Sequence, residues 1–230
     1  MFDAARGSEF RNLILMAEPA SITPFGQGSV RGFLHTPADS ASSGLVLTHG
    51  AGGNCEAPLL VAIANAFCRA GLLVLRCDLV FRQRKRFGPP APATAGENRA
   101  GLRDAVNTMR TLGSSQVYLG GHSYGGRQAS ILVAEEPGLV DALLLLSYPL
   151  HPPNKPNQLR TEHLSKLSLP ATFVHGTLDP FGSIEEMRAA LPMIPGKTQL
   201  IVVEGAGHDL ARGKFDLDRL VVAEFGTLTR

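Results

Sequence analysis

The sequence contains no tryptophan, only three cysteines and no long run of apolar residues. Cys55, Cys68 and Cys77 form an odd set without a C-x-x-C spacing, which argues against both a disulfide framework and a zinc site. The longest early apolar stretch, residues 13–17, is too short for the core of a signal peptide, and no stretch approaches the roughly 18 apolar residues of a membrane span. We therefore expect a soluble cytoplasmic protein without a membrane partner.

No sign of charge dominates the chain, because 22 basic and 20 acidic residues give a formal net charge of +2. This balance argues against nucleic acid as the main partner and favours a small molecule. The sequence has no G-x-G-x-x-G after its first predicted strand and no clustered metal-ligand spacing, so we expect no nucleotide cofactor and no metal. Oligomeric state is left open by these features.

The length of 230 residues predicts one domain. The tetrapeptide Gly7-Ser8-Glu9-Phe10 resembles the translation of adjacent cloning sites. We therefore expect residues 1–10 to be a leader that is not native or is disordered, and residues 11–230 to form the single domain.

Short β-rich runs alternate with longer helical ones along the chain. This alternation predicts the α/β fold class, with a mostly parallel central sheet and helices on both of its faces. The expected strands are residues 30–35, 45–48, 72–75, 117–119, 142–146, 171–174 and 199–203. The expected helices are residues 57–70, 95–112, 126–136, 184–191 and 215–225.

Two connections stand out by their proline content. The composition of residues 81–96 predicts neither helix nor strand, and this segment begins with a basic cluster of Arg82, Arg84, Lys85 and Arg86. Arg84 and Arg86 are the members considered for binding. Arginine pairs well with carboxylates and phosphates, so these two residues are candidate substrate-binding residues, with a solvated charged face as the alternative. Residues 148–170 are too few to hold a multi-helix cap, and we therefore expect a site open to solvent.

The strongest motif is the pentapeptide Gly121-His122-Ser123-Tyr124-Gly125, with a predicted strand before it and a predicted helix after it. This is the required context of a G-x-S-x-G nucleophile elbow. The flanking glycines allow strand and helix to approach closely, and the turn exposes the Ser123 hydroxyl beside the N–H groups at the start of the helix. Ser123 is therefore the candidate nucleophile.

A serine nucleophile needs a base, and the base needs an acid that orients it. Asp179 follows the predicted strand 171–174, and His208 follows the predicted strand 199–203. The carboxyl ends of parallel strands meet at one edge of the sheet, so these side chains can lie close to Ser123. Asp78, after an earlier strand, remains the alternative to Asp179.

The chain order Ser123, Asp179, His208 is similar to that of the α/β-hydrolases. The resemblance covers nearly the whole chain from about Val30 and is nearest to small esterases and dienelactone-hydrolase-like members without a large cap. Dienelactone hydrolases carry a cysteine at the elbow, whereas this chain carries Ser123, which favours ordinary esters over dienelactone.

A further match is Leu47-Thr48-His49-Gly50-Ala51-Gly52-Gly53-Asn54, which resembles the family's His-Gly oxyanion loop. By this resemblance the backbone N–H of Ala51, or alternatively Gly52, joins that of Tyr124 in binding the carbonyl oxyanion. Gly52 and His122 are further candidate substrate-binding residues, with shaping of the backbone around the site as the alternative for His122. Cys55 follows the loop and either lines the pocket or fills apolar space.

The resemblance implies a serine hydrolase that cleaves short soluble carboxylic esters or thioesters. Its partner would be a small-molecule ester. The alternative from another class is an interaction scaffold of the same fold without physiological turnover. A peptidase or amidase is a third possibility, although peptidases of this fold usually carry an extra cap or propeller domain.

Overall fold

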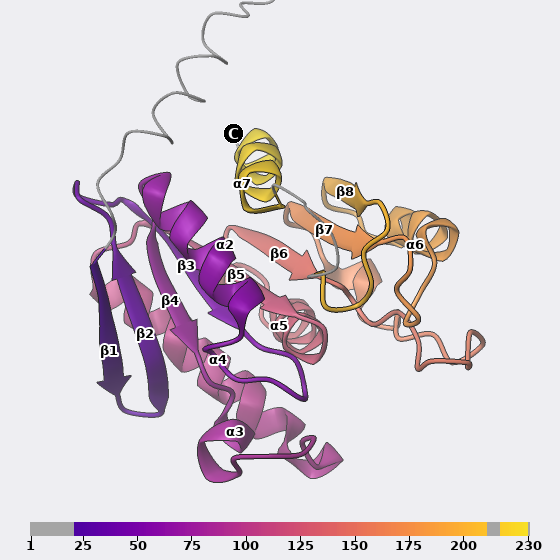
Figure 1. Ribbon diagram of the computed structural model, residues 1–230, viewed down its shortest axis with the longest axis horizontal. Helices are drawn as coiled ribbons and strands as arrows, with labels where there is room; N and C mark the ends of the chain where they lie inside the picture. Colours follow the sequence, from indigo (N-terminus) through magenta and orange to yellow (C-terminus); the bar gives the residue numbers. More distant parts are fainter. Residues whose placement is uncertain (1–20, 211–216, 230) are drawn as a thin grey trace, which may run out of the picture.

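The structure is a computed structural model, and it describes residues 21–210 and 217–229 (Figure 1). The predicted leader, residues 1–10, lies outside the described residues. The first two residues of the predicted C-terminal helix, 215 and 216, also lie outside them, and the described helix α7 spans Leu217–Leu228.

The described strands form one sheet in the order β1-β2-β4-β3-β5-β6-β7-β8. Strands β3 to β8 pair in parallel, whereas β1 with β2 and β2 with β4 pair antiparallel. The prediction of a mostly parallel sheet is confirmed. The strands are β1 (Ser21–Gln27), β2 (Val30–Thr36), β3 (Ser43–Thr48), β4 (Leu73–Cys77), β5 (Gln116–His122), β6 (Ala142–Leu146), β7 (Ala171–Gly176) and β8 (Thr198–Val203).

Helices cover both faces of the sheet, as predicted (Figure 1). Along β6, Leu143 and Leu145 pack toward one face, and Leu144 packs toward the other, as the two-residue period of a strand requires. The face of Leu144 is covered by α2 (Pro58–Arg69) and α7, and the opposite face by α4 (Ala95–Thr111) and α5 (Tyr124–Glu135). Strand β6 is buried along its whole length between these two layers, which explains why its sequence is continuously apolar.

Strand β1 is an element that the sequence did not predict. It contains Pro24, and six of its seven residues are exposed, so it shows neither a run nor an alternation of apolar side chains. It exists as the edge strand of a hairpin with β2, whose turn uses Gly28 at φ 56°. The pairing with β2, and not its own composition, makes it a strand.

The prediction that residues 81–96 contain no helix was wrong. A short helix, α3, spans Val80–Arg84, and a 3-10 turn, η1, spans Pro92–Thr94. The Asn98 side chain accepts a hydrogen bond from the Phe81 N–H at 3.0 Å, and Phe81 is buried. Five residues are too few to show a helical period, and contacts with the following helix stabilise the turn.

The remaining short elements are η2 (Leu164–Lys166), α6 (Ile184–Ala190) and η3 (Leu191–Met193). Within residues 21–210 and 217–229, no segment forms a separate cap domain over the sheet, in agreement with the prediction. Among the helices of these ranges, none has the length and apolar character needed to cross a membrane.

Candidate active site

Ser123 lies at the sharp turn between β5 and α5. Its backbone has φ 50°, a strained conformation for a residue other than glycine, and its N–H donates to the Leu146 carbonyl at 2.8 Å. A Cβ added at Gly121 would lie 2.6 Å from the Gly126 nitrogen, and one added at Gly125 would collide with the His49 carbonyl oxygen. The glycines are therefore required by close backbone approach, as the elbow motif predicted.

Replacing Gly125 with alanine is expected to lower the free energy of unfolding by about 3 kcal/mol, because the added methyl meets backbone that cannot move independently. Gly96→Ala is the matched control: this glycine is also helical, and no atom lies within 4 Å of an added Cβ. Its effect should stay within about 1 kcal/mol. Urea denaturation of both variants measures the difference, and equal stabilities would contradict the packing explanation.

Ser123, His208 and Asp179 form a continuous chain of hydrogen bonds. His208 Nδ1 lies 2.8 Å from Asp179 Oδ2 and 3.0 Å from Oδ1, and His208 Nε2 lies 2.7 Å from Ser123 Oγ. A carboxylate only accepts, so Nδ1–H donates to Asp179 and Nε2 is left to accept the serine proton. The Asp179 side chain is fully buried and also accepts from the Phe181 N–H at 2.9 Å.

Three side chains hold the loops that carry this chain of hydrogen bonds. The Phe181 ring stacks on the His208 imidazole with centroids 4.1 Å apart, a contact that the sequence did not predict. His122 Nε2–H donates to the His208 carbonyl oxygen at 2.8 Å, and burial lowers the pKa of His122, which keeps it neutral. His175 Nε2–H donates to the Gly182 carbonyl at 2.8 Å and so fixes the Asp179 loop.

Asp78, the alternative acid, lies with the loop after β3 rather than with His208. It accepts a hydrogen bond from the Cys55 N–H at 2.7 Å, and its carboxylate is 3.4 Å from His49 Nε2. The structure therefore brings Asp179, and not Asp78, within hydrogen-bonding distance of His208.

The loop after β3 is held in one conformation by buried His49. Its Nε2 accepts from the Leu79 N–H at 3.1 Å, and its Nδ1–H donates to the Gly50 carbonyl at 2.8 Å. Burial lowers the pKa of His49, consistent with this neutral tautomer. None of the hydrogen bonds in the described turns uses the Ala51 N–H, and Tyr124, the first residue of α5, has no acceptor within its helix. Both N–H groups remain available to an oxyanion.

Arg82 is the buried member of the basic cluster and ties this loop to the next one. Its Nη1 donates to the carbonyls of Lys85 and Arg86, and its Nη2 donates to those of Ala51 and Gly88, at 2.7–3.0 Å. The guanidinium thus donates a hydrogen bond to each of four backbone carbonyls.

Arg82→Ala should lower the free energy of unfolding by about 2–4 kcal/mol, because the four carbonyls lose a charged donor. Arg84→Ala is the control on the same helix. The Arg84 side chain is 65% exposed and pairs with Glu97 at the surface, so its loss should cost about 0.5 kcal/mol or less. Urea midpoints of the two variants give the comparison; a larger loss for Arg84→Ala would contradict it.

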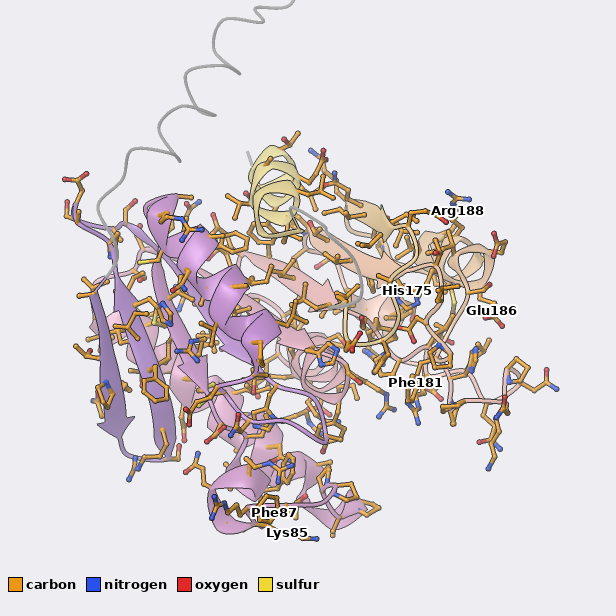
Figure 2. The ribbon with its side chains drawn as sticks, viewed as in Figure 1. Lys85, Phe87, His175, Phe181, Glu186 and Arg188 are labelled. Carbon is orange, nitrogen blue, oxygen red and sulfur yellow. The ribbon has the colours of Figure 1, made fainter. Side chains whose placement is uncertain are left out.

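Arg84 and Arg86 are not brought to Ser123. Arg84 pairs with Glu97, and the Arg86 guanidinium lies 5.2 Å from the Phe87 ring centroid. Figure 2 shows Phe87 at one extremity of the molecule, well separated in that view from Phe181. Neither arginine lines a cavity beside the serine.

Two cavities flank Ser123. The larger, about 600 Å³, is lined by the loop after β3, the start of α2 and His208, and it includes the predicted residues Gly52 and His122. The smaller, about 460 Å³, lies between residues 89–92, α5 and the connection after β6. Ser123, Ala51 and Phe181 line both cavities, so the two meet at the serine.

The cysteines lie outside both cavities. Cys55 is buried, and burial raises the pKa of its thiol to about 12. Its thiol is therefore protonated apolar filling at neutral pH. In the described part of the chain, no three His, Cys, Asp or Glu residues are grouped as metal ligands.

A mostly parallel sheet with a serine elbow, and with an acid and a histidine at the ends of later strands, defines the class of α/β-hydrolases. A family model described as an alpha/beta hydrolase domain matches residues 41–218. This match spans more than half of the sequence, and the chain belongs to the α/β-hydrolase family.

Solved structures show the same fold. Dienelactone hydrolase from Anabaena variabilis aligns with a TM-score of 0.68 and 21% identity over 92% of this chain and 95% of that chain. Est1E from Butyrivibrio proteoclasticus with ferulic acid bound aligns with a TM-score of 0.72 and 17% identity over 90% and 98% of the two chains. DcsB in complex with its substrate analogue gives 0.71 and 17% over 91% and 98%. At these identities the likeness concerns the fold.

Proposed function

We propose that this protein is a serine hydrolase that cleaves short carboxylic esters or thioesters through an acyl-enzyme. The observation that carries the proposal is the hydrogen-bonded chain from Asp179 through His208 to Ser123 Oγ. A complete chain of this kind at a strained elbow activates a hydroxyl, and a scaffold without turnover has no need of it.

The reaction would begin with attack of Ser123 Oγ on the ester carbonyl carbon while His208 Nε2 takes the serine proton. Asp179 stabilises the imidazolium that forms, and the N–H groups of Ala51 and Tyr124 donate to the oxyanion. His208 then gives the proton to the leaving group, at the oxygen of an alkoxide or at the sulfur of a thiolate. Water, deprotonated by His208, releases the acid from Ser123. This sequence uses no cofactor.

The two cavities supply room for the parts of a small ester on either side of Ser123. We assign Gly52 and His122 to the wall of the larger cavity and do not extend the proposal to Arg84 and Arg86, which line neither. The similar fold of Est1E, solved with ferulic acid bound, is consistent with small carboxylic acids as products. We keep a cytoplasmic location as part of the proposal.

The test is a burst and steady-state assay on p-nitrophenyl esters of increasing acyl length, with wild-type protein and Ser123→Ala side by side. We expect turnover by the wild type alone. The dependence of its rate on acyl length would then report the size of the acyl-binding site. No turnover of any ester by folded wild-type protein would favour an amide substrate or the scaffold alternative.

A further inference from the structure

The smaller cavity beside Ser123 contains two arginine side chains, Arg127 and Arg160. Arg127 lies on α5, one helical turn after Ser123, and Arg160 lies on the connection between β6 and β7. Both are partly buried. The rest of the wall is largely proline, alanine and aromatic side chain, so the two guanidinium groups are its principal charges.

Neither arginine has an acidic partner among the ion pairs of the described residues. Arg127 Nε is buried and has no hydrogen-bond partner there. Arg160 Nη1 lies 3.4 Å from the Pro149 carbonyl oxygen, which is long for a hydrogen bond. This contrasts with Arg99 and Arg103 on neighbouring α4, each of which pairs with a glutamate.

The groups that surround the two arginines leave their charge uncompensated. Burial, and then the positive charge of Arg127, lowers the pKa of Arg160. His163 is neutral at pH 7, because burial and then Arg127 lower its pKa to about 4. The exposed carboxylate of Glu162 opposes this field in part without forming an ion pair. Two guanidinium groups without an acidic partner in the wall of one cavity favour the binding of an anion there.

His208 sets the direction of the ester across the serine. In serine hydrolysis the histidine must reach the leaving oxygen in order to protonate it. His208 lines the larger cavity and is absent from the wall of the smaller one. The leaving alcohol therefore faces the larger cavity, and the acyl group extends toward Arg127 and Arg160.

We propose that the smaller cavity binds a carboxylate at the far end of the acyl group, so that the substrates are half-esters or half-thioesters of dicarboxylic acids. This inference rests on the proposed hydrolase function and names its substrate class. Arg127 lies one helical turn from the elbow, its N–H donates to the Ser123 carbonyl at 2.9 Å, and both residues line the smaller cavity, so a chain of a few carbons would span from Ser123 to the Arg127 side chain. The distal carboxylate takes no part in the reaction and keeps its charge. Bonds change only at the ester carbonyl carbon, which loses the alkoxide and gains Ser123 Oγ.

The test compares two esters of equal chain length, mono-4-nitrophenyl adipate and 4-nitrophenyl hexanoate. The ratio of their kcat/KM values is measured for wild type, Arg127→Met and Arg160→Met, with the rate of Ser123→Ala subtracted as background. Each methionine should lower the adipate-to-hexanoate ratio about tenfold or more, because a charged hydrogen-bonding partner is lost. A ratio taken within one variant is insensitive to a general loss of folded protein.

Two further variants make the comparison selective. Arg103→Met removes an arginine that lines neither cavity, and it should retain the wild-type ratio. The double variant Arg84→Met/Arg86→Met tests the prediction from the sequence that these two arginines bind the substrate. A fall in the ratio only for this double variant, or equal ratios in all variants, would overturn the assignment to Arg127 and Arg160.

A binding measurement separates this inference from the proposed function. Wild-type protein is titrated calorimetrically with adipate as the anion and with adipamide, which has the same chain length and no ester bond, as the neutral reference. If no ester is hydrolysed but adipate binds and Arg160→Met abolishes its binding, the anion site stands and the hydrolase proposal fails. Hydrolysis with no preference for the anion and no binding of adipate would leave the hydrolase and overturn the anion site.

Discussion

Ser123→Ala is expected to lower kcat for p-nitrophenyl butyrate by about 10⁴- to 10⁶-fold. The alanine removes the oxygen that forms the acyl-enzyme, while Tyr124 and Ala51 keep their positions for the oxyanion. Steady-state assays at saturating ester, with the spontaneous rate subtracted, measure the effect. The residual rate should show no burst of p-nitrophenol.

The alanine should leave the fold intact, because the Ser123 hydroxyl contacts His208 at the surface of the two cavities and fills no core position. Circular dichroism and the urea midpoint provide the control. A correctly folded alanine variant that retains more than about a tenth of the wild-type kcat would show that another residue is the nucleophile.

Asp179→Asn is expected to lower kcat by about 10⁴-fold. Asparagine can present an N–H to His208 Nδ1, which then has to accept, so the imidazole proton moves to Nε2. Protonated Nε2 cannot take the proton of Ser123, and the neutral amide no longer stabilises the imidazolium. The shape of the site is retained, so KM should change far less than kcat in the same assay.

Asp78→Asn is the matched control, and it also tests the alternative that the sequence left open. The asparagine oxygen can still accept from the Cys55 N–H, and Asp78 does not contact His208. We expect kcat to change less than about tenfold. A loss for Asp78→Asn equal to that for Asp179→Asn would contradict the assignment of the orienting acid.

The elbow and the parallel core were predictable because their causes are local. The sequence around Ser123 carries its own glycines, and β6 is a continuous apolar run whose predicted bounds agree with the structure. Asp179 and His208 could be placed near Ser123 because parallel strands end at one edge. Their hydrogen bonds agree with that placement, and their catalytic roles remain a prediction.

The parts that were missed depend on contacts with other segments and not on the composition of the segment itself. Strand β1 carries a proline and few buried residues, and its pairing with β2 defines it. Phe181 stacks on His208, 27 residues further along the chain, and Arg127 and Arg160, which are far apart in the sequence, line one cavity only in the folded chain. The sequence showed that the basic cluster is charged, but not which way each side chain points. Arg82 points inward and donates to the Ala51 carbonyl, whereas Arg84 pairs with Glu97 at the surface.

The central claim is that Ser123 is an activated nucleophile, and the most direct measurement is labelling by a fluorophosphonate followed by peptide mass spectrometry. We expect one adduct per folded chain, located on Ser123 and strongly reduced in His208→Ala, because the base is needed to activate the hydroxyl. Absence of an adduct in the folded wild-type protein, or an adduct on a different residue, would contradict it.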